Sequence, residues 1–242
     1  MVPAGKFFAY AVVVAWAGVA VSATTLLAAD EPRSPCTEDA MLVFDASGSM
    51  AGNGWGYGSE NPHAVSRMDK VRLALAKILP RITRMRRVGL ITYGPGPYQQ
   101  CNVQLDLKPA TNTASRILDV VNGLIPAGQT PLSEAVEQAA EVLDYRTEPG
   151  LIVVLTDGEE TCGGEPCALG KALHKEAFQL TVHVIGLRVK GLTWTGEQSV
   201  VETQCLAETN GGLFVAVNTE QELIDALEKT LGCPMLTQAT GR

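Results

Sequence analysis

The sequence predicts an α/β fold built on a six-stranded, mostly parallel sheet with helices on both faces. Short, continuous apolar segments alternate with amphipathic segments along the chain, and several apolar segments stop at aspartate, glycine or proline. Such strands are typical of a sheet buried on both faces, and strand–helix alternation is typical of α/β proteins. The 242 residues are 46% hydrophobic and 5% aromatic, which excludes an intrinsically disordered chain and predicts an aliphatic core.

Each element follows from its own pattern. Strands are predicted where apolar residues run together, at 41–44, 88–93, 151–155, 180–186 and 213–217. Helices are predicted where apolar residues recur at helical spacing, at 68–84, 114–125, 132–145, 167–178, 197–210 and 219–231. Residues 102–107 alternate instead, with Val103, Leu105 and Leu107 on one face, which favours a half-covered antiparallel strand at an edge of the sheet.

Residues 1–29 are predicted to be a secretory signal peptide. Lys6 precedes an uncharged stretch from Phe7 to Ala29, and small residues stand just before Asp30. An uncleaved N-terminal membrane anchor is the alternative, because the stretch is long enough to span a bilayer. Both interpretations export the rest of the chain, which would be periplasmic or secreted. We expect a lead-in over 30–39, a single domain over 40–233 and a C-terminal tail over 234–242.

The six cysteines all follow this segment, and an even number in an exported chain predicts three disulfides. Cys36 and Cys233 flank everything that is expected to fold, so we expect them to pair. Cys162 and Cys167 are separated by a turn-rich spacer, which predicts a second pair and leaves Cys101 with Cys205. A redox-active pair and a zinc site are weaker alternatives, since the spacing is not Cys-x-x-Cys and no second pair stands at ligand spacing.

Charge and motif content exclude several function classes. A formal net charge of −7 argues against nucleic-acid binding, which needs a basic surface. The chain has no GxxxxGK[ST] loop for nucleotide phosphates. None of the three histidines stands in a motif that would make it a catalytic base, so we expect no enzymatic activity and no catalytic residue; the histidines are His63, His174 and His183.

Two predicted strands end in aspartate, at Asp45 and Asp157. The carboxyl ends of parallel strands meet at one edge of a sheet, where ligands bind. Asp45 opens the sequence Asp45-Ala46-Ser47-Gly48-Ser49, and a third oxygen-rich loop contains Thr130. These hard oxygen donors suit Mg²⁺, or alternatively Mn²⁺ or Ca²⁺, and two carboxylates leave such an ion able to accept a further carboxylate from outside. Taken singly, the aspartates and serines could instead be helix N-caps.

Together these residues resemble the von Willebrand factor A (VWA) domain found in exported bacterial proteins. The resemblance covers roughly residues 37–231. Its metal-ion-dependent adhesion site is Asp-x-Ser-x-Ser with a distant Thr and Asp, which here fall on Asp45, Ser47, Ser49, Thr130 and Asp157. The resemblance implies a doubly wound, Rossmann-like sheet with one antiparallel edge strand. It also implies that the three hydroxyls contact the metal, that the aspartates act partly through water, and that a partner's Glu or Asp completes the coordination.

The expected function is therefore metal-dependent capture of a protein or peptide partner. Trp55 and Tyr57 in the 51–66 loop, and Trp194 in the 187–198 segment, are candidate partner contacts at the rim, with packing against the domain as the alternative. Glu159 and Glu160 are interpreted as a solvated acidic turn. The competing function is a metal-independent structural or assembly module of the cell envelope, acting through the same two loops. Membrane contact is expected only through an uncleaved N-terminal segment.

Overall fold

The computed structural model describes Met1 and residues 36–52, 66–96, 100–187 and 194–233. The chain divides into two units, Met1–Pro32 and Arg33–Arg242, and every helix and strand among the described residues belongs to the second. The predicted signal peptide and C-terminal tail lie outside the described residues, so the proposed domain boundaries stay predictions. Within the described ranges, no helix has both the length and the apolar character needed to cross a membrane.

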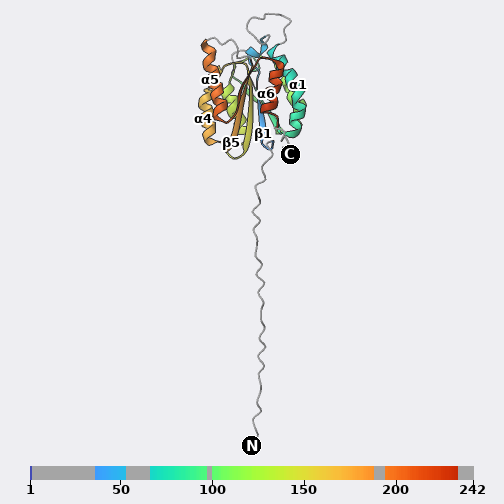
Figure 1. Ribbon diagram of the computed structural model, residues 1–242, viewed down its shortest axis with the longest axis vertical. Helices are drawn as coiled ribbons and strands as arrows, with labels where there is room; N and C mark the ends of the chain where they lie inside the picture. The colour runs from blue at the N-terminus through green and yellow to red at the C-terminus, as the bar shows by residue number, and fades with distance from the viewer. Residues whose placement is uncertain (2–35, 53–65, 97–99, 188–193, 234–242) are drawn as a thin grey trace, which may run out of the picture. The chain divides into compact units, whose positions relative to one another are not determined.

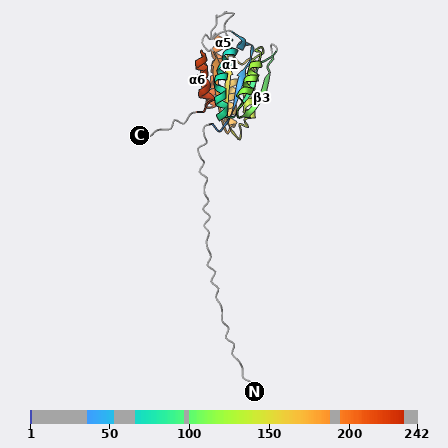
Figure 2. The same ribbon diagram turned by 90° about the vertical axis from the view of Figure 1, so that its right-hand side faces the viewer.

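Six strands form one sheet in the order β3-β2-β1-β4-β5-β6. All neighbours are parallel except β2 and β3, which confirms the mostly parallel sheet with an antiparallel edge strand. Figure 2 shows β3 at the side of the sheet. The strands are β1 (Asp39–Asp45), β2 (Val88–Tyr93), β3 (Val103–Ala110), β4 (Pro149–Thr156), β5 (Gln179–Leu187) and β6 (Phe214–Val217).

Helices cover both faces of the sheet (Figure 1). One face packs against α1 (Arg67–Met85), α2 (Ala114–Gly123) and α6 (Glu220–Thr230). The other packs against α3 (Leu132–Val142), α4 (Pro166–Glu176) and α5 (Trp194–Thr209). A short 3₁₀ turn, η1 (Gly48–Ala51), follows β1. All six predicted helices are present, with boundaries that differ from prediction by a few residues.

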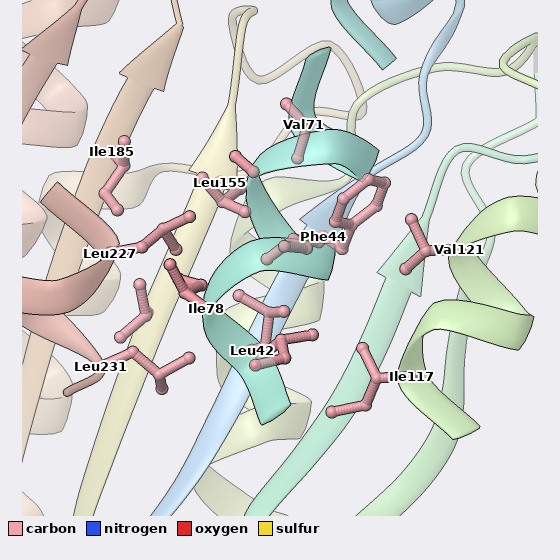
Figure 3. Close-up of a cluster of buried hydrophobic side chains, with 14 of the residues drawn as sticks. Leu42, Phe44, Val71, Ile78, Ile117, Val121, Leu155, Ile185, Leu227 and Leu231 are labelled. Carbon is pink, nitrogen blue, oxygen red and sulfur yellow. The ribbon is translucent and has the colours of Figure 1, made fainter. Parts of the chain in front are cut away.

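The core consists of two aliphatic layers, one on each side of the sheet. Leu42 and Phe44 of β1 face the layer that includes Ile78 of α1, Ile117 of α2 and Leu227 of α6 (Figure 3). Met41 and Val43 alternate with them and face the second layer. Each of these β1 side chains is fully buried, and burying a side chain of this size contributes about 1.5–3 kcal/mol to stability. The central strands are therefore firmly held, and so are the residues at their ends.

The strand order reverses direction at the carboxyl end of β1. The chain proceeds from β1 to β2 on one side of the sheet, whereas β4, β5 and β6 are added on the other side. The loops that follow the neighbouring strands β1 and β4 therefore lead to opposite faces of the sheet. Open α/β sheets bind ligands at such a point. Asp45 is the last residue of β1, and Asp157 directly follows β4.

Candidate metal centre at the carboxyl edge of the sheet

The two aspartates meet at the ends of neighbouring parallel strands. Asp45 is fully buried, and the side chain of Asp157 has no exposed surface. Asp45 Oδ1 accepts a hydrogen bond of 2.8 Å from the Ser47 backbone N–H. Asp45 Oδ2 accepts one of 2.8 Å from the Thr156 hydroxyl and a longer one of 3.4 Å from the Asp157 N–H. The Asp45 carboxylate is thus fixed from both sides with its neighbour close by.

This arrangement accumulates negative charge in a buried place. Burial and, after it, the nearby charge of Asp157 together raise the pKa of Asp45 to about 6, against the lowering effect of the hydrogen bonds from Ser47 and Thr156. Desolvation and a like charge both disfavour the ionised form of a carboxyl group. A cation at this edge would oppose both effects, so the electrostatics of the two carboxylates fit a bound divalent ion.

Three hydroxyls adjoin the carboxylates. The Ser47 and Ser49 hydroxyl oxygens are 2.9 Å apart, and the Ser49 hydroxyl donates to Asp157 Oδ1 over 2.5 Å. The position that a Cβ atom would take on Gly158 lies 3.5 Å from Ser49 Oγ and 3.8 Å from Thr130 Oγ1. The structure therefore brings together all five residues that the sequence nominated as metal ligands. Ser47 and Thr130 are buried, whereas Ser49 is exposed.

The loop after β1 is pinned to the loops that follow β2 and α2. Ser47 forms a parallel bridge with Gly128, and the Gly48 N–H donates to the Gly128 carbonyl at 3.0 Å. The Gly128 N–H in turn donates to the Gly94 carbonyl at 2.7 Å. Gly94 has a φ of 74°, and a Cβ there would lie 2.5 Å from the Gln129 carbonyl oxygen and 2.8 Å from Ser47 Cα. Only glycine fits this crossing.

Gly94→Ala should therefore destabilise the domain by about 2–3 kcal/mol, because the new methyl group meets backbone on two sides and the φ angle disfavours alanine. Urea unfolding followed by circular dichroism measures this change. Gly123→Ala is the matched control, since no atom lies within 4 Å of the added Cβ and the residue ends a helix. It should be neutral or stabilise by up to about 1 kcal/mol. Equal effects of the two substitutions would contradict the packing argument.

Thr130 is held by the loop that follows β4. Its N–H donates to the Thr161 hydroxyl at 2.8 Å, and the Thr161 N–H donates to the Thr130 carbonyl at 3.1 Å. The Glu160 carboxylate accepts from the N–H groups of Ser133 and Cys162, each at 2.8 Å. Glu160 thereby caps the N-terminus of α3 from another loop, which corrects its interpretation as part of a merely solvated turn.

Two of the three predicted disulfides are wrong. Cys36 bonds Cys233 as predicted, but Cys162 bonds Cys101, with Cα atoms 5.9 Å apart, and Cys167 bonds Cys205. The predicted Cys162–Cys167 and Cys101–Cys205 pairs fail because Cys167 lies in the first turn of α4, which packs against α5, the helix that carries Cys205. Cys162 stays in the preceding loop beside Cys101.

The sequence did not indicate three further residues of this edge. Thr156 ends β4 and donates to Asp45. Tyr93 ends β2 in register with Asp45, and its pKa is raised well above the usual value by burial and then by the Asp45 charge. Arg67, the first residue of α1, forms an ion pair with Asp157. No motif marks Tyr93 or Arg67, although ligand-binding residues are expected at strand ends on this edge of the sheet.

The predicted rim and the histidines lie apart from these residues or outside the described ones. Trp55, Tyr57 and His63 are outside the described residues, and Trp194 is placed only as the first residue of α5. His174 is exposed on α4. His183 lies on β5, where its Nδ1 accepts a hydrogen bond from the Leu213 N–H at 2.9 Å. Among the described residues, no group of three or more His, Cys, Asp or Glu is placed to hold a metal. The donor set at this edge is therefore two carboxylates with hydroxyls.

Comparisons with known proteins agree with this architecture. Over 203 residues, covering 80% of this chain and 82% of the relative, the sequence is 25% identical to "Uncharacterized protein YwmC" of Bacillus subtilis. A similar solved structure is an aerotolerance-related membrane protein from Bacteroides fragilis, with a TM-score of 0.55 and 20% identity over 80% of this chain and 98% of that one.

A second similar structure is the proximal thread matrix protein 1 of the mussel byssus with a zinc-occupied MIDAS motif. Its TM-score is 0.53 and its identity 18%, over 82% of this chain and 46% of that one. At such identities these structures establish the fold. The model of the von Willebrand factor type A domain matches residues 40–160, which is half of the 242-residue chain, and the chain therefore belongs to the von Willebrand factor type A family.

Proposed function

We propose that this domain is exported and captures a protein or peptide partner through a divalent cation at the carboxyl edge of its sheet. The observation that carries the proposal is the convergence of two buried carboxylates, Asp45 and Asp157, with hydroxyls beside them. Ser47, Ser49 and Thr130 would supply neutral oxygen donors, and the aspartates would supply the compensating charge. When bound, the ion would offer a Lewis-acidic position to a carboxylate of the partner.

Mg²⁺ is the ion that this donor set favours, with Mn²⁺ or Ca²⁺ as alternatives. Carboxylate and hydroxyl oxygens are hard ligands, whereas the usual ligands of zinc include thiolate and imidazole. The mussel protein named above holds zinc in its motif. Thiolate and imidazole are not part of the donor set of this chain, so Mg²⁺ stays the expected ion here.

Export and an outward-facing site are consistent with the disulfides. Three disulfides are typical of an oxidising compartment outside the cytosol. Cys36 precedes β1 and bonds Cys233, whereas Asp45 ends β1. The chain therefore enters the domain at the opposite end of β1 from the aspartates.

We infer no catalytic role for the site. Its carboxylates and hydroxyls hydrogen-bond one another, whereas His183 accepts a hydrogen bond from the Leu213 N–H on another part of the fold and His174 is exposed on α4. A nucleophilic serine needs an adjacent base. Ser49 instead donates its proton toward Asp157, the carboxylate that a cation would share.

Thr130→Ala should abolish partner capture while leaving the fold intact. The immobilised domain would be exposed to the native envelope fraction with Mg²⁺, and retained proteins eluted with a chelator. We expect the wild type and the control variant to retain partner proteins and Thr130→Ala to retain none, with retention lost in chelator and regained on adding Mg²⁺. Thr147→Ala is the control, because the exposed Thr147 hydroxyl bonds, among the described residues, just the Asp144 carbonyl. Retention that survives both the chelator and Thr130→Ala would favour the metal-independent assembly module instead.

A further inference from the structure

Arg67 is delivered to the metal edge by a well-fixed helix start. Ser66 caps α1: its hydroxyl oxygen accepts from the Asp69 N–H at 3.0 Å, and its hydroxyl donates to the Asp69 carboxylate at 2.7 Å. The Arg67 N–H donates to the Gly52 carbonyl at 3.0 Å. Such reciprocal capping fixes the first turn of a helix. The backbone of Arg67 is therefore held beside the loop that carries Ser47 and Ser49.

The Arg67 guanidinium lies on the same carboxylate that the proposed metal would use. Its Nη1 pairs with Asp157 Oδ2, while Asp157 Oδ1 accepts from Ser49. The Arg67 side chain is 15% exposed and that of Asp157 is 0% exposed, so the pair is largely shielded from water. Arg67 Nε is buried and has no hydrogen-bond partner among the described residues. In this position of the guanidinium, the Nε–H group therefore donates no hydrogen bond to the described residues.

Gly52 allows the guanidinium to lie there. A Cβ atom on Gly52 would stand 3.0 Å from Arg67 Cζ, closer than side-chain atoms normally approach. Gly52 itself has φ −62° and ψ 145°, a conformation that any residue adopts. An alanine at this position would therefore displace the arginine head at an ordinary φ and ψ for residue 52, and its Cβ would also lie 3.1 Å from the Ser49 carbonyl oxygen.

We propose that Arg67 is a tethered cation that competes with the divalent ion for Asp157 and so sets the affinity of the metal site. This inference rests on the proposed function, because it assumes that the edge binds a cation. A guanidinium and a divalent ion beside one carboxylate repel each other, and the repulsion is strong where water is excluded. In the metal-free domain, Arg67 supplies the positive charge that the two aspartates lack. Metal binding then has to weaken or replace that ion pair.

Four substitutions separate this role from an ordinary structural ion pair. Arg67→Gln removes the charge and keeps most of the side chain, and Arg67→Lys keeps the charge. Gly52→Ala keeps every charge and moves the guanidinium. Arg81→Gln is the matched control, since Arg81 lies on the same helix and pairs with the exposed Glu228. Calorimetric titration with Mg²⁺, and with Mn²⁺ as a second probe, gives the dissociation constants, and thermal unfolding without metal gives the second measurement.

We expect Arg67→Gln to tighten Mg²⁺ binding about tenfold and Gly52→Ala to tighten it in the same direction, because each removes the competing charge from Asp157. Arg67→Lys should stay within about threefold of the wild type, and Arg81→Gln should not change the affinity. Without metal, Arg67→Gln should unfold at a lower temperature than the wild type. A residue that merely stabilises the metal-binding conformation would lose affinity and stability together.

The outcomes that overturn the proposal are distinct from failure of the proposed function. If the wild type binds Mg²⁺ and Arg67→Gln binds it equally or more weakly, Arg67 does not compete and only this inference is wrong. If the wild type binds no cation but Arg67→Gln does, competition is supported in its strongest form. If neither protein binds Mg²⁺ or Mn²⁺ although both are folded, the metal site itself is refuted and the inference with it.

Discussion

Asp45→Asn should abolish divalent-cation binding and yet leave the metal-free domain more stable than the wild type. Asp45 is fully buried, and Asp157 lies beside it. Folding therefore removes a charge from water next to a like charge, and an amide of the same shape avoids that cost. The Asn oxygen can still accept from the Ser47 N–H, while the Thr156 hydroxyl can accept from the new amide. We expect a gain of about 1–3 kcal/mol in the metal-free state at neutral pH.

The same substitution should remove stabilisation by metal. A ligand present at one hundred times its dissociation constant stabilises the native state by about 2.7 kcal/mol. For a domain of this size, that corresponds to a rise of roughly 5–10 °C in the unfolding midpoint. Asp45→Asn keeps the neutral donors but loses one of the two charges that balance the ion. Its midpoint should therefore respond little to added Mg²⁺, whereas the wild-type midpoint should rise.

Asp106→Asn is the matched control for these two expected effects of Asp45→Asn, the higher stability without metal and the lost response to Mg²⁺. Like Asp45, Asp106 accepts a hydrogen bond from a threonine hydroxyl, that of Thr92, at 2.8 Å, but Asp106 is only half-buried and lies on the edge strand β3. Its substitution should leave the metal-induced rise intact. Differential scanning calorimetry with and without Mg²⁺ measures all three proteins. A metal-induced rise that persists in Asp45→Asn, or a metal-free variant that is clearly less stable, would refute the assignment of Asp45.

The sheet could be predicted from sequence because its determinants are local. The five strands with continuous apolar character and the alternating strand β3 each carry their pattern within a few residues, and six strands follow in the expected positions. The residues of the candidate metal site could be predicted from the sequence in the same way, since aspartates at the ends of two neighbouring parallel strands must meet at one edge of the sheet. The prediction rested on strand ends, and strand ends are set by the same apolar pattern.

Contacts between side chains that are far apart in the sequence could not be predicted from local patterns. Arg67 belongs to a helix start 90 residues from Asp157, and nothing in its sequence context distinguishes it from any other arginine on an amphipathic helix. The cysteine pairs failed for a related reason. A turn-rich spacer brings Cys162 near Cys167 along the chain, but Pro166 begins α4 and directs the two residues to different partners. The direction of a side chain depends on the helix, strand or loop that carries it. The number of residues between two cysteines carries no information about that direction.

The Cys101–Cys162 disulfide has a consequence for the candidate metal site. It joins the loop before β3 to the loop after β4, and the Thr130 loop lies between them. The Gln129 N–H donates to the Gln100 carbonyl at 3.1 Å, and Thr130 exchanges two hydrogen bonds with Thr161. Gln100, the partner of Gln129, directly precedes Cys101, and Thr161, the partner of Thr130, directly precedes Cys162. The disulfide should hold the Thr130 hydroxyl in place for the metal.

Replacing Cys101 and Cys162 together by serine should therefore lower both stability and metal affinity. The closed loop spans 61 residues, for which chain entropy predicts a loss of about 4 kcal/mol. Mg²⁺ affinity should fall about three- to tenfold, because ordering the freed loop costs conformational entropy on binding. Replacing Cys167 and Cys205 together opens a loop of 38 residues and should cost nearly as much stability, about 4 kcal/mol, with affinity unchanged.

The affinities would be compared at low temperature, where circular dichroism verifies that both double variants are folded. Cys36→Ser with Cys233→Ser extends the comparison, because that bond spans 197 residues and its Cys36 precedes β1, at the end opposite to Asp45. Chain entropy assigns it a stability loss of about 5 kcal/mol, the largest of the three. If metal affinity followed stability across the three double variants, the Cys101–Cys162 bond would act only on the fold. If affinity fell only in the Cys101/Cys162 variant, the bond positions the Thr130 loop for the ion.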